Sequence, residues 1–280
     1  MENTGRLLNF FRNCNQEFIV SSLILLLIIT VAIFPAWFTR YDPYEQNMEA
    51  LMQPPSAGHF FGTDNFGRDC YSRVIYGTRV DLVIGVLATA VPFLTGVFIG
   101  LVSGYFGGKI DAVMMRILDI TTAFPFTVLI ILIVSILGTG MRNLYIAIWL
   151  VGWREYAKLS RSEVLVEKNA EYVQAAKVLG FSNARILFRH IMPNVVQSSV
   201  VYGITDIMLC MLTAAGMSFM GLGVEVPTPE WGAIISEGRP FMAYAWWIST
   251  FPGIVLMLTG ITINVFGSSV SRMMKQMHGR

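Results

Sequence analysis

Long stretches of this chain contain no Asp, Glu, Lys or Arg, and most of their residues are apolar. A helix that spans a membrane needs about 20 predominantly apolar residues. The stretches are continuously apolar, which favours helices over barrel strands, because barrel strands alternate apolar with polar residues. The pattern therefore predicts an all-α, polytopic membrane protein with about six transmembrane helices, at 18–38, 81–105, 117–138, 143–157, 196–222 and 246–267. The fourth of these is short for a span.

The composition strengthens this prediction. Hydrophobic residues make up 54% of the chain and charged residues only 14%, whereas an ordinary soluble domain carries about 25% charged residues. So few charges disfavour a cytoplasmic enzyme and a disordered chain, and the net charge of +2 is too small to attract a polyanion. Cys14, Cys70 and Cys210 lie far apart with no C-x-x-C pair, so we expect packing residues rather than disulfides or a metal site.

The distribution of Lys and Arg predicts the orientation of the chain. With a cytoplasmic N-terminus, fourteen of these residues fall on the inside and six on the outside, in agreement with the positive-inside rule. We therefore expect both termini in the cytoplasm. The chain then divides into a cytoplasmic N-terminus at 1–17, a first transmembrane helix at 18–38, an extracytoplasmic loop at 39–80, a transmembrane core at 81–272 and a cytoplasmic C-terminus at 273–280.

The long polar stretch on the predicted inside is the loop 154–194. Good helix formers run from Glu155 to Leu179, and Gly180 then ends the pattern as a C-terminal glycine does. Ser182 or the residue after it is suited to cap a second, short helix. The loop is therefore expected to form a helix–glycine–helix hairpin. Such a hairpin is either an amphipathic connector on the membrane surface or a docking element for a cytoplasmic partner.

The sequence Gln174-Ala175-Ala176, with Gly180 and Pro193 further along, resembles the EAA loop of ABC-importer permeases. The chain departs from the family pattern in having Gln for Glu at its first position, and His190 and Met192 where the family has Ile and Leu. In the family this loop is a coupling helix that fits into a cleft of an ATPase subunit. The resemblance assigns ATPase coupling to the matching positions and the neighbouring phenylalanine: Gln174, Ala175, Ala176, Gly180, Phe181 and Pro193.

Two further motifs resemble signatures of the dipeptide, oligopeptide and nickel permeases, and most closely those of the second of the two permeases that such importers usually contain. One follows Pro54-Pro55-Ser56 in the extracytoplasmic loop, and the other follows the fifth apolar segment. His59 belongs to the first motif, and we expect it to make a structural hydrogen bond rather than to bind metal. The residues that carry the two signatures are Gly62, Thr63, Asp64, Gly67, Arg68, Asp69, Trp231 and Gly232.

Together the motifs imply a permease subunit of a binding-protein-dependent ABC importer in a bacterial-type cytoplasmic membrane. The expected partners are a homologous permease subunit, two ATPase subunits, an extracytoplasmic substrate-binding protein and membrane lipid, with no nucleic acid. The chain has no G-x-x-x-x-G-K-[ST] phosphate-binding loop. It is therefore not expected to be an enzyme, and ATP and Mg²⁺ belong to the ATPase subunits. Peptides or chelates of nickel or other metals would move inward by alternating access.

A stand-alone secondary transporter or channel is the alternative, and it would need inverted repeats or intramembrane ion sites. Asp206 is an acidic residue inside the fifth apolar segment, where a charge is costly unless it is paired or faces water. It therefore either lines the translocation path, as Met208 also could, or makes an interhelical hydrogen bond. Gly96, Gly100 and Gly104 share one helical stripe and are expected to let another helix pack closely.

Overall fold

The computed structural model describes residues 16–278, in which the regular structure is helical and the only β-pairing is an isolated bridge between Thr63 and Asp69. This agrees with the predicted all-α class. Cys14 and all but the last two residues of the predicted cytoplasmic N-terminus at 1–17 lie outside the described residues, as do residues 279–280 of the predicted C-terminal segment.

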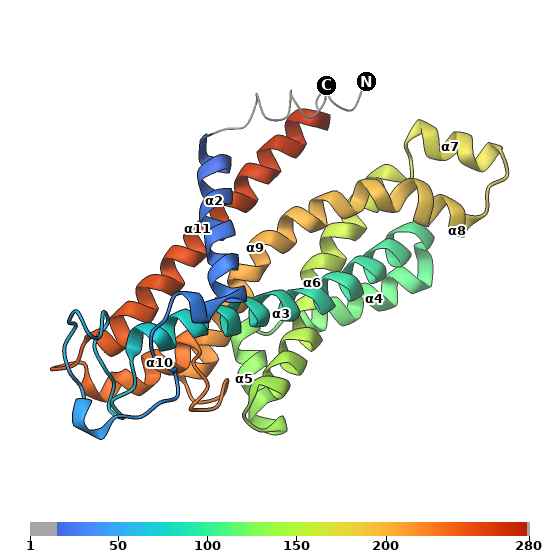
Figure 1. Cartoon of the computed structure of the whole chain (residues 1–280). Helices are drawn as coiled ribbons and strands as arrows, with labels where there is room; N and C mark the ends of the chain where they lie inside the picture. The colour runs from blue at the N-terminus through green and yellow to red at the C-terminus, as the bar shows by residue number, and fades with distance from the viewer. Residues whose placement is uncertain (1–15, 279–280) are drawn as a thin grey trace. The chain divides into compact units, whose positions relative to one another are not determined.

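The chain forms two compact units. One contains the chain up to Leu82 and again from Val226 onward. Within it, α2 packs along α11, and Arg79 donates a hydrogen bond from Nε to the carbonyl of Ala32 at the end of α2 (2.7 Å). The elements of this unit are α2 (Gln16–Ile33), η1 (Pro35–Trp37), η2 (Met48–Ala50), the start of α3 (Cys70–Phe106), α10 (Trp231–Gly238), η4 (Arg239–Phe241) and α11 (Trp247–His278) (Figure 1).

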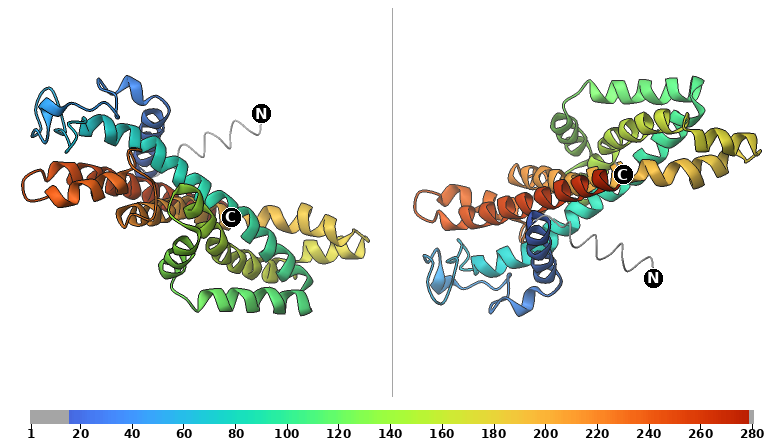
Figure 2. Two further views of the ribbon diagram at one scale, coloured as in Figure 1. Left: turned by 90° about the horizontal axis from the view of Figure 1, so that it is seen from below. Right: turned by 90° about the horizontal axis from the view of Figure 1, so that it is seen from above.

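The other unit is Val83–Glu225. In it α4 runs beside α6, and the short helices α7 and α8 form a hairpin at the end of α6 and α9 (Figures 1 and 2). Its elements are the rest of α3, α4 (Gly108–Thr122), α5 (Phe126–Leu137), α6 (Met141–Glu167), α7 (Glu171–Val178), α8 (Asn183–Arg185), the π-helical η3 (Ile186–Ile191) and α9 (Met192–Phe219).

By length and composition, four helical stretches among the described residues can cross a membrane: Gln16–Ile33, Cys70–Phe106, Asn183–Phe219 and Trp247–Gln276. They contain or largely overlap four of the six predicted segments. The predicted fourth segment, 143–157, lies inside α6, which continues into polar sequence as far as Glu167. Because α3 begins at Cys70, the predicted extracytoplasmic loop 39–80 ends in helix rather than in irregular chain.

A kink at Pro125 is expected within the predicted segment 117–138, and the structure has a full break there rather than one continuous helix. The structure has α4 and α5 in its place, bent by 87° at a short break, and together they count as a fifth crossing only as a broken span. The break lies at Pro125, which is the N-cap of α5. Proline has no backbone N–H and disfavours helical geometry at the residue before it, so the helix cannot continue through this position.

The prediction of one helix from Glu155 to Leu179 is wrong. Helix α6 ends at Glu167, and α7 begins at Glu171 after a short turn. Asn169 lies in this turn and donates a hydrogen bond from its side chain back to the carbonyl of Leu165 (3.0 Å). Asn competes for backbone groups in this way, which makes it a poor residue for a helix interior.

The glycine stripe of α3 packs closely against α6, as predicted. A Cβ atom on Gly96 would lie 2.2 Å from the carbonyl oxygen of Trp153, and one on Gly100 would lie 2.5 Å from that of Ala157. At Gly104 the corresponding distance to the carbonyl oxygen of Arg161 is 3.1 Å. The absence of side chains on this stripe therefore allows the two helix backbones to approach each other.

Candidate functional site

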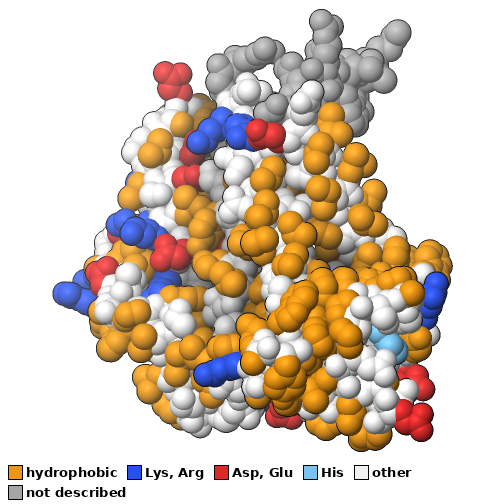
Figure 3. Space-filling view, turned by 90° about the vertical axis from the view of Figure 1, so that its left-hand side faces the viewer, with side chains coloured by type: hydrophobic (Ala, Val, Ile, Leu, Met, Phe, Trp, Pro, Cys, Tyr) orange, Lys and Arg blue, Asp and Glu red, His pale blue; other side chains and the backbone are white. Residues whose placement is uncertain are grey.

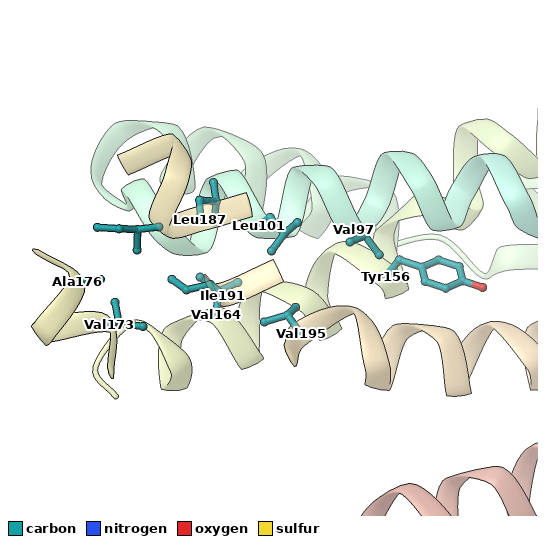
Figure 4. Close-up of a cluster of buried hydrophobic side chains, with 10 residues drawn as sticks. Val97, Leu101, Tyr156, Val164, Val173, Ala176, Leu187, Ile191 and Val195 are labelled. Carbon is teal, nitrogen blue, oxygen red and sulfur yellow. The ribbon is translucent and has the colours of Figure 1, made fainter. Parts of the chain in front are cut away.

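The hairpin that follows α6 is anchored by apolar side chains on one face of α7. Val173 and Ala176 are three residues apart and therefore lie on the same side of the helix. Both are buried, and Figure 4 shows them facing the segment that carries Leu187 and Ile191. The rest of the buried cluster comes from α3, α6, η3 and α9: Val97, Leu101, Tyr156, Val164, Ile186 and Val195.

The tip of the hairpin exposes apolar side chains. Val178 is 88% exposed and Leu179 is 71% exposed, and Lys177 beside them is also exposed. Gln174 and Ala175 lie on the same exposed side of α7. Large apolar side chains that stand out from a firmly packed element are typical of an interaction surface.

Gly180 makes the turn after α7. Its φ is +74°, in the left-handed region, and a Cβ atom added to it would have no neighbour within 4 Å. The glycine is therefore required for its backbone conformation and not for space. The N–H of Phe181 donates to the carbonyl of Ala176 (3.2 Å) and that of Gly180 to the carbonyl of Lys177 (3.0 Å), which together form a Schellman motif.

Gln174 and Phe181, which are also predicted to take part in ATPase coupling, contact neighbouring parts of the chain. The side-chain amide of Gln174 donates a hydrogen bond to the carbonyl of Lys168 at the end of α6 (3.0 Å). The ring of Phe181 stacks on that of His190, with 5.8 Å between their centroids, and the guanidinium of Arg185 lies 4.0 Å from its centre. Pro193 lies apart from the tip, in the first turn of α9, where its missing N–H is tolerated.

The pKa values of two groups near the base of the hairpin, Glu163 and Tyr172, are raised by their surroundings. Burial raises the pKa of Glu163 on α6, while a hydrogen bond with Ser198 on α9 opposes the shift. Burial also raises the pKa of Tyr172, and its hydrogen bond to Glu167 raises it further. Through these hydrogen bonds Glu163 links α6 to α9, and Tyr172 links α7 to the end of α6.

The charged residues of the motif in the loop 39–80 form a buried network. Asp64 accepts hydrogen bonds from Arg68 Nε (2.6 Å) and from Arg73 Nη1 (2.8 Å). Both arginines also reach Glu237 of α10, at 3.0 and 2.7 Å. Two positive and two negative charges thus neutralise each other, and the side chains of Asp64, Arg68 and Arg73 are at most 1% exposed. The network ties the loop to α10.

The remaining residues of the loop motif fix its backbone. Gly62 and Gly67 have φ values of +70° and +72°, and a Cβ atom on Gly67 would lie 1.8 Å from the carbonyl oxygen of Asn47. The hydroxyl of Thr63 donates to the carbonyl of Ala50. Asp69 accepts a hydrogen bond from the backbone N–H of Ser72 (2.7 Å) at the start of α3.

His59 and the second signature make structural contacts as well. His59 Nδ1 lies 2.9 Å from Asp69 Oδ1, in agreement with its predicted structural role. Trp231 is fully buried, and its indole N–H donates to the carbonyl of Val74 (2.9 Å). The N–H of Gly232 donates to Glu230 Oε1 (3.0 Å). The residues that carry both signatures therefore make structural contacts within the unit formed by the chain up to Leu82 and from Val226 onward.

Asp206 lies in α9 and has a partner on another helix. The hydroxyl of Tyr156 on α6 donates to Asp206 Oδ2 (2.7 Å), and Cys210 Sγ lies 3.9 Å from the same oxygen. The interhelical hydrogen bond, one of the two alternatives for this residue, is therefore present. Met208, two residues further along α9, is half-buried.

The match to a family model shows which protein family the chain belongs to. The model described as the binding-protein-dependent transport system inner membrane component matches residues 96–276, which is more than half of the chain. The chain belongs to this family. A second model, the N-terminal TM domain of oligopeptide transport permease C, matches residues 15–55.

Relatives over almost the full length agree with this family. The permease is 39% identical to the dipeptide transport system permease protein DppC of Alkalihalophilus pseudofirmus and to the oligopeptide transport system permease protein OppC of Bacillus subtilis; each match covers 91% of this chain and 84% of the relative. It is 36% identical to the glutathione transport system permease protein GsiD of Pectobacterium atrosepticum, over 90% of this chain and 84% of the relative.

The similarity of this chain to solved structures shows only its fold. The inward-facing MetNI methionine ABC transporter matches with a TM-score of 0.58 at 15% identity, over 71% of this chain and 95% of the other. The permease is thus a multi-pass inner-membrane subunit of a binding-protein-dependent ABC importer, and it is a transport component rather than an enzyme. Family membership decides against the alternative of a stand-alone secondary transporter or channel.

Three polar residues of this permease are not singled out by the sequence motifs: Glu237, Tyr172 and Asn194. Glu237 lies 169 positions from Arg68, so no local spacing connects them. The loop motif carries Asp64 and Asp69 beside Arg68 and Arg73, so its charges balance in the sequence and give no signal for a further acid. Tyr172 and Asn194 have no signal either, because their contacts depend on how the hairpin folds back.

Proposed function

We propose that the permease serves an importer of short peptides, working beside a homologous permease subunit, two ATPase subunits that hold ATP and Mg²⁺, and an extracytoplasmic binding protein. The relatives described above, which are named for dipeptides, oligopeptides and glutathione, support the peptide class. Nickel or metal chelates are the second candidate, because the same outer signatures occur in nickel permeases. The orientation with both termini in the cytoplasm is supported by the excess of Lys and Arg in the segments that it places inside.

The observation that carries the coupling role is the exposed tip of the hairpin. Val178 and Leu179 offer an apolar surface at the end of a short helix whose other face is buried in the permease. We infer that this tip enters a cleft of a partner ATPase, with Gln174 and Ala175 beside it and Ala176, Gly180 and Phe181 holding its shape. Pro193 sets the start of α9. ATP-driven closure of the two ATPases then moves the hairpins and reorients the path.

Asp206 and Met208 stay candidates for that path. The support for Asp206 is its carboxylate on a helix long and apolar enough to span the membrane, since such groups usually face protein or water. Its hydrogen bond with Tyr156 is compatible with this role, because a second carboxylate oxygen is left to contact a substrate ammonium group.

Stimulation of ATP hydrolysis by loaded binding proteins tests the substrate class. The complete importer in lipid vesicles is presented with its binding protein loaded with a dipeptide, an oligopeptide or a nickel chelate. We expect a peptide-loaded protein to stimulate hydrolysis and the nickel-loaded protein to have no effect. Stimulation by the nickel chelate alone would overturn the peptide assignment. Uptake of a radiolabelled dipeptide into the same vesicles by the Asp206→Asn variant shows whether the carboxylate contributes to transport.

The Val178→Asp variant tests the docking surface. A charge at the centre of an apolar contact must be desolvated without a partner, and buried interface anchors contribute about 2 kcal/mol or more, or roughly 30-fold in affinity. We expect much smaller amounts of the ATPase subunits to co-purify with the variant. We also expect the loaded binding protein no longer to stimulate ATP hydrolysis.

The matched control for this variant is Val166→Asp. Val166 is also exposed (73%) but lies on α6, away from the tip. Its aspartate variant is expected to retain the ATPase subunits. Equal retention by both variants would contradict docking at the tip.

A further inference from the structure

A second group of contacts lies at the base of the hairpin, opposite its exposed tip. The hydroxyl of Tyr172 on α7 donates a hydrogen bond to Glu167 Oε2 at the end of α6. Asn194 on α9 donates from Nδ2 to the hydroxyl oxygen of Tyr172 (3.0 Å) and lies 3.5 Å from the same carboxylate oxygen. We call Glu167, Tyr172 and Asn194 the base triad. Its members come from three helices that meet where the hairpin leaves the unit.

A lysine in the connecting turn extends these contacts to a fourth helix. Lys168 donates from Nζ to the carbonyl of Gly104 on α3 (3.0 Å), while its own carbonyl accepts the hydrogen bond of Gln174. On the other arm of the hairpin, the hydroxyl of Tyr105 donates to Asn183 Oδ1 (3.0 Å). The hairpin is thus joined by directional bonds to α3, α6 and α9.

Hydrogen bonds constrain the orientation of α7 more strictly than apolar contacts do, because their strength depends on the angle between donor and acceptor. Buried contacts such as those of Val173 and Ala176 hold α7 against the unit by close packing, and hydrogen bonds add a constraint on its direction. The chain itself gives little resistance to rotation or sliding, because α7 is joined to α6 by a turn of three residues and to α8 by the glycine turn. The base triad fixes the direction of α7 relative to α6 and α9.

We propose that Glu167, Tyr172 and Asn194 are positioning residues that make α7 move together with α6 and α9. A push on the tip then displaces these helices instead of being absorbed by a swing of the hairpin. This inference rests on the proposed docking of the tip, but it makes a separate claim: docking decides whether the ATPase binds, and the base triad decides how much of its movement reaches the helices.

The test compares Tyr172→Phe and Asn194→Ala in the complete importer, with two measurements. In the first, amide hydrogen exchange of residues 171–179 is expected to rise about three- to tenfold in both variants, as loss of one net hydrogen bond predicts. In the second, the amount of a radiolabelled dipeptide transported per ATP hydrolysed is expected to fall by about threefold, while the ATPase subunits co-purify as in the parent.

Two control variants make the result specific. Ser162→Ala removes a side-chain hydrogen bond that stays within α6, from the Ser162 hydroxyl to the carbonyl of Leu159 (2.7 Å), so both measurements are expected to stay at the parental level. Glu167→Gln keeps an acceptor for the Tyr172 hydroxyl and is expected to retain most of the coupling.

The proposal is overturned if hydrogen exchange at 171–179 in Tyr172→Phe and Asn194→Ala matches that of the parent. A failure of the docking hypothesis gives a different result, since Val178→Asp would then retain its ATPase subunits whatever the exchange rates of the base triad variants.

Discussion

Asp64→Ala is expected to lower the free energy of unfolding of the permease by about 3–5 kcal/mol, the usual effect of removing one partner from a buried ionic network. Asp64 accepts hydrogen bonds from Arg68 and Arg73, and also from the backbone N–H groups of Phe66 (2.8 Å) and Arg68 (3.0 Å). Without it, two buried guanidinium groups share only Glu237, and one positive charge is left uncompensated.

The measurement for Asp64→Ala is thermal unfolding of the purified permease in detergent, together with its abundance in the membrane. Glu45→Ala is the matched control, since Glu45 is an exposed acid of the same loop and such substitutions usually change stability by no more than about 0.5 kcal/mol. If both variants unfold at the temperature of the parent, the network does not hold the loop and α10 together.

The double substitution Gly96→Ala, Gly100→Ala is expected to destabilise the packing of α3 on α6 by about 2–6 kcal/mol, taking about 1–3 kcal/mol for each overpacked site. The new Cβ atoms would lie 2.2 and 2.5 Å from carbonyl oxygens of α6. These are backbone atoms, so no side chain can rotate away to make room, and the helices must move apart.

Gly216→Ala on α9 is the control for the glycine stripe. A Cβ atom there has no neighbour within 4 Å, so this variant is expected to be neutral or to gain up to about 1 kcal/mol from the better helix propensity of alanine. Thermal unfolding of both variants checks the prediction. A double variant as stable as Gly216→Ala would show that the two helices are not closely packed at these positions.

Much of the fold is encoded in patterns that are local in sequence. The apolar runs predict the spanning helices because lipid exposure requires them, and the glycine stripe predicts the close packing at Gly96 and Gly100 because both lie on one helical face. The turn at Gly180 is likewise evident from a single glycine after a helical segment. The segment 117–138 is interrupted at Pro125, where a kink is expected, whereas the single helix expected from Glu155 to Leu179 is wrong because Asn169 interrupts an otherwise favourable run.

The candidate sites depend more strongly on contacts between distant residues. The hairpin tip could be located from the motif around Ala176 and Gly180, but its base triad joins residues on three helices and has no spacing to reveal it. In the outer loop the motif identifies Asp64 and Arg68, yet their burial and their shared partner Glu237 emerge only in the folded chain. A charged motif in a polar loop is expected to be exposed on the surface unless its buried partners are known.

In the loop 39–80 the residues of the family signature are separate from the exposed residues. The side chains of Asp64 and Arg68 are buried, whereas aromatic residues such as Tyr44 and Phe60 are exposed, and hydrophobic side chains make up much of the face shown in Figure 3. Changes among the outward-facing residues leave the loop's internal bonds intact. The loop can therefore vary on its surface while its signature stays unchanged.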